Sequence, residues 1–219
     1  MSPPLRRMTP QQRRALWIVA GLAVLGFLAV LVAAIDPTVI ALDQATRNAV
    51  RSGRHPLLHG PMKTLNRLGS GDVQLPVAAV VCIVTWRRHR RLASSVIVVS
   101  VATVVGVAVL KWLIGKPRPT MSAYGFPSGH VLGTLVFSGV LLYLLWIFAV
   151  ARGWRVVTIV GCALLTCGVA YSRLYVNAHW LTDVMGGVTG GFAATALGLL
   201  FMDTQLADEP VAPPGSPAG

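Results

Sequence analysis

The sequence is short of charge, and of acidic residues above all. Only 12% of its 219 residues are Asp, Glu, Lys or Arg, about half the share typical of a soluble domain. Seven acidic residues accompany 19 Lys and Arg, and Asp183 alone lies between residues 73 and 202. One carboxylate in so long a stretch excludes a two-metal phosphatase site and a glycosidase pair, because both need several carboxylates.

Cysteine is scarce as well. Cys82, Cys162 and Cys167 lie inside apolar runs without zinc-site spacing or a disulfide framework, so we expect small buried hydrophobic residues. The net charge of +12 suits nucleic acid, anionic lipid or an anionic substrate. Nucleic acid is disfavoured, because the basic residues stand in short segments between apolar runs and form no nucleic-acid-binding module.

What the sequence does have is long apolar runs, which make up most of its 54% of hydrophobic residues. Six runs approach the roughly 20 residues needed to cross a bilayer, and we predict an all-α bundle of six transmembrane helices. They lie at about 15–35, 70–86, 92–114, 129–150, 155–174 and 181–202. The second is the weakest, since Gln74 and Pro76 lie near its start. In the sixth, "GGVTGG" (186–191) predicts close helix packing.

The predicted domain is a single membrane unit over 1–203, followed by a disordered Pro-, Gly- and Ala-rich tail over 204–219. The first apolar run, about 21 residues long, exceeds the core of a cleaved signal peptide. Cytoplasmic N- and C-termini would leave ten basic residues inside and nine outside. The tight clusters at 13–14 and 87–91, which flank spans, decide for that topology.

Residues 36–69 are predicted to form two short interfacial helices between the first two spans. Asp36-Pro37 is an N-cap with proline at the first helical position, Gly53 ends this helix, and a second covers roughly 57–68. Charged residues share one face of the first helix: Asp43, Arg47, Arg51 and Arg54. This face is either a solvated cover for the helix ends or a basic collar for anionic lipid headgroups.

Three polar motifs fall at the outer membrane face in this topology. "KWLIGKPRP" (111–119) ends the third span, "PSGH" (127–130) opens the fourth, and "SRLYVNAHWLTD" (172–183) joins the fifth to the sixth. Because these three motifs are distant in sequence but fall on one side of the membrane, we predict that they form a single site.

The first motif is suited to phosphate. Arg118 stands between two prolines, so a stiff turn presents a guanidinium that can bind phosphate oxygens bidentately. Lys111 is either a second ligand or a lysine that snorkels to the interface. Lys116, in the same turn, is either a further ligand or a solvated charge.

The second motif opens a helix. Ser128 is a candidate N-cap, and Gly129 allows its N–H to approach a ligand at a helix N-terminus, which is a ready anion site. His130 follows on the first turn, where it is a candidate general acid.

The third motif supplies a nucleophile. His179 and Asp183 are one helical turn apart, so the carboxylate can fix the imidazole tautomer and leave the other nitrogen free. The alternative is an ion pair at a helix start. With Lys111, Arg118 and Arg173 against one carboxylate, the surplus positive charge implies an anion of about two or three charges, such as a phosphate monoester or diphosphate.

A mechanism follows from these residue types. We expect His179, oriented by Asp183, to attack phosphorus and form a phosphohistidine, while His130 protonates the leaving group. Water then hydrolyses the intermediate. Preorganised positive charge lowers the barrier, so no metal ion or other cofactor is predicted.

These residues resemble the three-part signature of the type-2 phosphatidic acid phosphatase superfamily: K-x6-RP (111–119), PSGH (127–130) and SR-x5-H-x3-D (172–183). The resemblance implies an all-helical membrane fold and a metal-independent phosphohistidine mechanism. It implies His130 as acid, His179 as nucleophile and Asp183 as the orienting group. The implied phosphate ligands are Lys111, Arg118, Ser128, Gly129 and Arg173. Val131 and Asn177 depart from the residues usual at their positions, which changes the shape of the pocket and leaves the chemistry intact.

We therefore predict an integral membrane lipid phosphatase with its site on the extracytoplasmic side and lipid phosphate and membrane lipids as partners. Undecaprenyl diphosphate ranks first as substrate, on a prior about small six-span members; phosphatidylglycerophosphate, phosphatidate and lipid A are alternatives. A lipid phosphotransferase remains open within the enzyme class. A non-catalytic transporter or binding protein for anionic lipids is the alternative outside it, although it requires neither His130 nor the His179–Asp183 spacing. The oligomeric state is left open.

Overall fold

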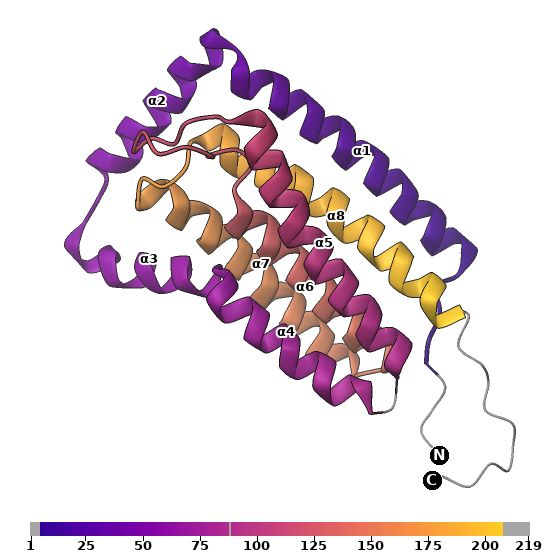
Figure 1. The fold of residues 1–219 in the computed structure, drawn as a ribbon. Helices are drawn as coiled ribbons and strands as arrows, with labels where there is room; N and C mark the ends of the chain where they lie inside the picture. The colour runs from indigo at the N-terminus through magenta and orange to yellow at the C-terminus, as the bar shows by residue number, and fades with distance from the viewer. Residues whose placement is uncertain (1–4, 88, 208–219) are drawn as a thin grey trace, which may run out of the picture.

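The computed structural model describes residues 5–87 and 89–207, and all regular structure within them is helical (Figure 1). This confirms the all-α prediction. The helices are α1 (Pro10–Ile35), α2 (Pro37–Ser52), α3 (Pro56–Leu68), α4 (Gly71–Trp86), α5 (Arg90–Ile114), α6 (Gly129–Ile147), α7 (Arg152–Tyr175) and α8 (Leu181–Ala207).

Five helices are long and apolar enough to cross a membrane, namely α1, α5, α6, α7 and α8. Helix α4 has only 16 residues and bends by 45° from α3; together the two count as a sixth candidate span. Pro61 lies inside α3 and Pro76 inside α4, and proline removes a helical hydrogen bond. The predicted six-span bundle is thus found, with its least regular span where the sequence was weakest.

The outer surfaces of these helices are apolar. Large hydrophobic side chains stand exposed along α1, α4 and α7, among them Trp17, Leu25, Ile83, Trp154 and Leu164. A water-soluble protein does not expose so much contiguous apolar surface. The chain is an integral membrane protein.

The core lies around α6 and α8, which pack closely along their length (Figure 1). A Cβ added at Gly191 would lie 2.7 Å from the Leu135 side chain, and one at Gly187 would lie 2.8 Å from the Ser128 carbonyl oxygen. Only glycine permits this approach, so the predicted close packing at 186–191 is confirmed. The approach at Gly187 also seats the start of α6 against α8, where two of the three motifs lie.

Helices α2 and α3 lie at one end of the bundle, while the start of α1 and the end of α8 lie at the other (Figure 1). Asp36 caps α2 through its bond from the Thr38 N–H (2.8 Å), and Gly53 ends it, as predicted. Residues 204–207 of the predicted tail continue α8, and 208–219 lie outside the described residues.

Candidate active site

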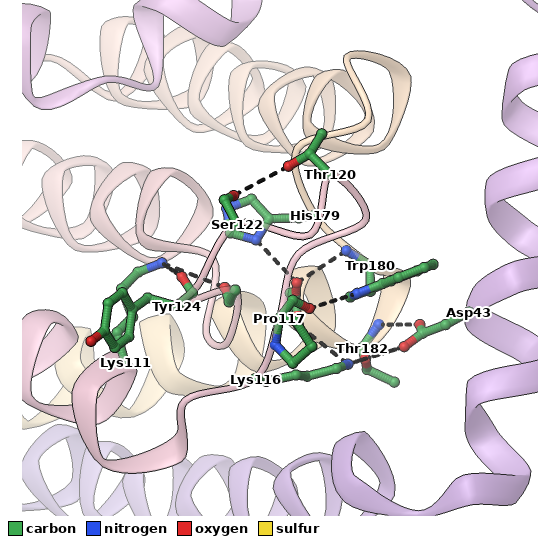
Figure 2. Close-up of polar contacts among 12 residues, drawn as sticks. Asp43, Lys111, Lys116, Pro117, Thr120, Ser122, Tyr124, His179, Trp180 and Thr182 are labelled. Carbon is green, nitrogen blue, oxygen red and sulfur yellow. Dashed lines mark hydrogen bonds and ion pairs between the residues drawn. The ribbon is translucent and has the colours of Figure 1, made fainter.

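The three motifs meet at the end of the bundle that carries α2 and α3. The segment 115–128 folds back over the start of α8: the Ser128 N–H donates to the Asp183 carbonyl (2.9 Å), and the Trp180 indole N–H to the Pro117 carbonyl (2.9 Å). Figure 2 shows Lys116 and Pro117 of the first motif close to His179 and Trp180 of the third. The predicted juxtaposition of the motifs is therefore present.

His179 and Asp183 form a buried pair. The imidazole Nδ1 lies 3.1 Å from Asp183 Oδ2, and the two residues are 4% and 0% exposed. The Trp180 N–H also donates to Oδ2 (3.0 Å), which fixes the carboxylate. An ionised carboxylate only accepts, so it selects the tautomer with the proton on Nδ1 and leaves the Nε2 lone pair free.

Burial lowers the pKa of His179 to about 4, although the Asp183 carboxylate opposes the shift. The positive charges of Arg173 and Lys111 act in the same direction as burial. The imidazole is consequently neutral near pH 7. A neutral imidazole bonded to a carboxylate fits a nucleophile better than the alternative of a simple ion pair.

Three buried donors, one from each motif, have no hydrogen-bond partner among the described residues: Arg118 Nε, Ser128 Oγ and Arg173 Nε. A buried donor without a partner costs about 1–3 kcal/mol, so such groups are rare away from functional sites. Ser128 holds the N-cap position of α6, as predicted, and its hydroxyl makes no capping bond, so this donor stays available to a ligand. Donors of this kind fit an anion with several oxygens.

His130 and Lys111 complete the cluster. His130, on the first turn of α6, lies within electrostatic reach of His179, Arg173, Lys111 and Arg118. Lys111 donates to the carbonyls of Tyr124 (2.8 Å) and Gly125 (3.4 Å). An ammonium has three donors, so these two bonds leave one for a ligand. Lys111 therefore points into the site, and its side chain does not snorkel to the membrane interface.

Lys116 is a buried member of the site and not a solvated charge. Its side chain is 10% exposed, and its ammonium lies 3.1 Å from Asp43 Oδ2 and 3.3 Å from Asp183 Oδ1. Asp43, on α2, also accepts from the Thr182 N–H (2.9 Å) and hydroxyl (2.7 Å). Figure 2 shows Lys116 reaching both Asp43 and Thr182.

The sequence did not identify Asp43 or Asn66 as residues of the site. Asn66 lies on α3 and accepts a hydrogen bond from the Arg173 guanidinium. Asp43 had a usable signal, since it is the one acid on an otherwise basic helical face. Asn66 had none, because no charge pattern or motif surrounds it.

Arg47 on α2 and Arg54, which follows the end of α2, both have partners near the loop that carries His179. Arg47 donates to the Asn177 side chain (2.8 Å) and lies over the Trp180 ring, 5.7 Å from its centroid. Arg54 bonds the Tyr175 carbonyl and lies over that ring at 5.5 Å. Neither a freely solvated cover nor an open collar describes these two arginines. Arg47 joins α2 to the loop that carries His179, and Arg54 joins the segment after α2 to the end of α7.

An apolar cavity of about 290 Å³ opens beside the cluster, between α4, α5 and α6. Gly129 and His130 line it at the site, and Leu144 lines it three to four turns further along α6, about 20 Å away at 1.5 Å per residue. Valine is the commonest lining residue and comes from all three helices, for example Val81, Val104 and Val140. The cavity can hold a hydrocarbon chain next to His130.

In 5–87 and 89–207, no three His, Cys, Asp or Glu side chains are grouped so that they could hold a metal ion. The three thiols are free; Cys82 is buried, whereas Cys167 is exposed on α7, contrary to the buried position expected for it.

A family model described as the PAP2 superfamily matches residues 91–207. The chain is 30% identical to an undecaprenyl-diphosphatase of Sulfolobus acidocaldarius over 59% of its own length and 64% of that relative, so it spans just under two thirds of it. It is 26% identical to phosphatidylglycerophosphatase B of Bacillus subtilis, over 75% of the chain and 86% of the relative.

The fold also matches a solved structure, that of a transmembrane PAP2-type phosphatidylglycerolphosphate phosphatase from Bacillus subtilis. The TM-score is 0.75 at 22% identity, over 82% of this chain and 93% of that one. At 22% identity, this similarity supports a shared fold and nothing beyond it.

Proposed function

The chain belongs to the PAP2 superfamily, and on that premise we propose that it is a membrane lipid phosphatase that works through a phosphohistidine at His179. The observation that carries the proposal is the set of buried, unpartnered donors on Arg118, Ser128 and Arg173. They belong to the three motifs that meet at the end of the bundle where the neutral imidazole of His179 lies. A phosphoryl group would satisfy them while it is held for attack.

In the first step His179 Nε2 attacks phosphorus, and a P–N bond forms as the P–O bond to the leaving group breaks. The electron pair goes to the leaving oxygen, which takes a proton from His130. The leaving group is a lipid alcohol from a monoester or a lipid monophosphate from a diphosphate. Asp183 offsets the positive charge that the imidazole gains.

In the second step water attacks the phosphohistidine. His130 takes a proton from the water and so returns to the protonated form in which it began the cycle. The electrons of the P–N bond return to Nε2, which releases inorganic phosphate and restores the neutral imidazole of His179. Arg118, Arg173 and Lys111, with the Ser128 hydroxyl and the Gly129 N–H, are proposed to bind the phosphoryl oxygens in both steps. No metal ion or cofactor has a role in this scheme.

Charge and shape favour a lipid phosphate as the substrate. Four buried or half-buried cations (Lys111, Lys116, Arg118 and Arg173) accompany the carboxylates of Asp43 and Asp183, which leaves two positive charges for an anion. The cavity that begins at His130 is apolar and about 20 Å long, a space for a prenyl or acyl chain. The relatives' names make undecaprenyl diphosphate and phosphatidylglycerophosphate the first two substrates to test.

We propose that the site faces the extracytoplasmic side, with both termini cytoplasmic. The basic clusters at the start of α1 and between α4 and α5 lie at the end of the bundle opposite the site (Figure 1). The positive-inside rule puts that end in the cytoplasm.

A phosphate-release panel in detergent tests the function. Undecaprenyl diphosphate, phosphatidylglycerophosphate and phosphatidate are compared at equal concentration, with EDTA present and absent. We expect release from at least one substrate, unchanged by EDTA, and a loss of at least about 10⁴-fold in H179A. His59, an exposed histidine on α3, gives the matched control H59A, which should keep its activity.

Three outcomes would overturn the proposal. Unchanged turnover in H179A would remove the nucleophile. Tight lipid binding by wild type without phosphate release would favour an anionic-lipid binding protein instead. Transfer of the phosphoryl group to an added alcohol in preference to water would identify a phosphotransferase.

A further inference from the structure

We propose that Asp43 and Lys116 are positioning residues, through which helix α2 holds the Asp183 carboxylate and thereby orients His179. As far as it concerns catalysis, this inference rests on the function proposed above. Asp43 lies outside the three motifs, on a helix that they do not include.

The contacts form an unbroken path from α2 to the nucleophile. Asp43 Oδ2 lies 3.1 Å from the Lys116 ammonium, which lies 3.3 Å from Asp183 Oδ1. The other oxygen of that carboxylate, Oδ2, lies 3.1 Å from His179 Nδ1. Asp183 Oδ2 is therefore held by hydrogen bonds. Oδ1 accepts no hydrogen bond from the described residues, so the ion pair with Lys116 is what holds that side of the carboxylate.

Asp43 also fixes the start of α8. It accepts from the N–H and the hydroxyl of Thr182, the residue before Asp183. Asp43 is 4% exposed and Thr182 3%, so water cannot replace these bonds without rearrangement. A shift of α2 would therefore move both the backbone and the side-chain partner of Asp183.

Lys116 is paired with two carboxylates, those of Asp43 and Asp183, so its effect goes beyond that of an ion pair that only stabilises the fold. Two buried carboxylates share one ammonium, and a buried carboxylate without its partner is costly. Lys116 therefore sets how much of the Asp183 charge acts on His179. Arg173 (α7), Lys111 (α5) and His130 (α6) are the other titratable or charged groups that interact with His179. Arg118, in the 115–128 segment, acts on His130.

The two positioning residues should act with opposite sign. In K116Q, the Asp183 charge is no longer offset, so protonation of the His179–Asp183 pair becomes easier and its apparent pKa rises. In D43N, Lys116 turns wholly to Asp183 and one negative charge is lost, so the same apparent pKa falls. A residue that only supports the fold would not produce opposite shifts.

The experiment follows the imidazole of His179 directly. The full-length protein, labelled with ¹⁵N-histidine, is titrated in detergent micelles, and the His179 resonance is assigned from its loss in H179Q. We expect a rise of about one pH unit in K116Q and a fall in D43N. The exposed residues Lys63 and Asp72 give the matched controls K63Q and D72N, which should leave the titration unchanged.

Kinetics provide the second measurement. We expect kcat to fall about tenfold to a hundredfold in K116Q and D43N with little change in KM, because the substrate is still bound but the nucleophile is misplaced. K116R keeps the charge and should recover part of the rate. Thermal unfolding separates these effects from loss of fold; if K116Q or D43N does not fold, the charge-conserving K116R and D43E carry the comparison.

Shifts of the same sign in K116Q and D43N, or titrations equal to those of the controls, would overturn the inference. The titration needs no substrate, so it tests the Asp43–Lys116 link even if no lipid on the panel is hydrolysed. That last result would remove the proposed function and leave the positioning role to be decided by the titration.

Discussion

Helix α8 carries two buried aspartates, one at each end of the bundle, and they behave differently. Asp183 and Asp203 are 0% and 3% exposed and lie about 30 Å apart along one helix axis. Asp203 accepts from the Met8 N–H (3.1 Å) and the Tyr143 hydroxyl (3.2 Å), with Arg13 at 3.7 Å. Asp183 instead bonds an imidazole and shares an ammonium with a second carboxylate.

The difference shows that burial of a carboxylate does not by itself indicate a functional site. At the Asp203 end, the carboxylate joins the N-terminal segment to α6 and α8, and its contacts close the fold. At the Asp183 end, unpartnered donors from three separate segments gather around the pair. A surplus of unsatisfied donors, and not the buried acid, distinguishes a site that can take an anion from one that is complete.

Among substitutions that test the difference between Asp183 and Asp203, we expect the largest effect on catalysis. We predict that D183N lowers kcat by about 10³- to 10⁴-fold, because the asparagine cannot select the tautomer or offset the charge on the imidazole. Steady-state phosphate release measures it, with circular dichroism to show that the helices are intact. A loss below tenfold would mean that Asp183 plays the same structural part as Asp203.

The two arginines whose Nε atoms have no partner among the described residues, Arg118 and Arg173, give the next largest effect. R118Q or R173Q should lower kcat/KM by about 10²- to 10³-fold, because each removes charge from the phosphoryl oxygens. Arg155 has a buried, unpartnered Nε as well, but it lies at the start of α7, at the other end of the bundle. R155Q is therefore the matched control and should stay within about twofold of wild type; equal losses in all three would argue against a phosphate-binding role.

The sequence predicted local features of the molecule better than contacts between distant segments. Helix bounds came within a few residues because hydrophobic run length and caps such as Asp36-Pro37 are local properties. The residues of the site that lie in the three motifs could be named for the same reason. Asp43 and Asn66 could not, because their partners are distant in sequence and depend on how α2 and α3 fold back. The exposed-charge interpretation of Lys116 failed likewise, since only the packed structure brings Asp43 beside it.

A smaller effect concerns pH. Catalysis needs neutral His179, and because burial lowers the pKa of that imidazole to about 4, the active form should persist well below pH 6.5. We predict an acid limb of kcat/KM near pH 4, with activity present above it and lost as the pH falls through it. A pH profile with a soluble phosphate monoester measures the limb once the rates are corrected for the second ionisation of the ester, whose pKa is about 6. A limb at about 6.5 would mean that His179 titrates like an exposed histidine.

The smallest effect on catalysis is predicted at the other end of α8. D203N keeps the shape of the side chain but removes its charge, so the bonds from the Met8 N–H and the Tyr143 hydroxyl weaken and the attraction of Arg13 is lost. We expect a loss of about 1–3 kcal/mol in stability, seen as a thermal unfolding midpoint lower by a few degrees, with kcat/KM unchanged below that temperature. The same substitution at Asp183 should do the reverse, with a large loss of rate and the helices retained. If D203N also slowed phosphate release while folded, the two ends of the bundle would be coupled, and the distinction between a closing contact and a catalytic one would no longer hold on this helix.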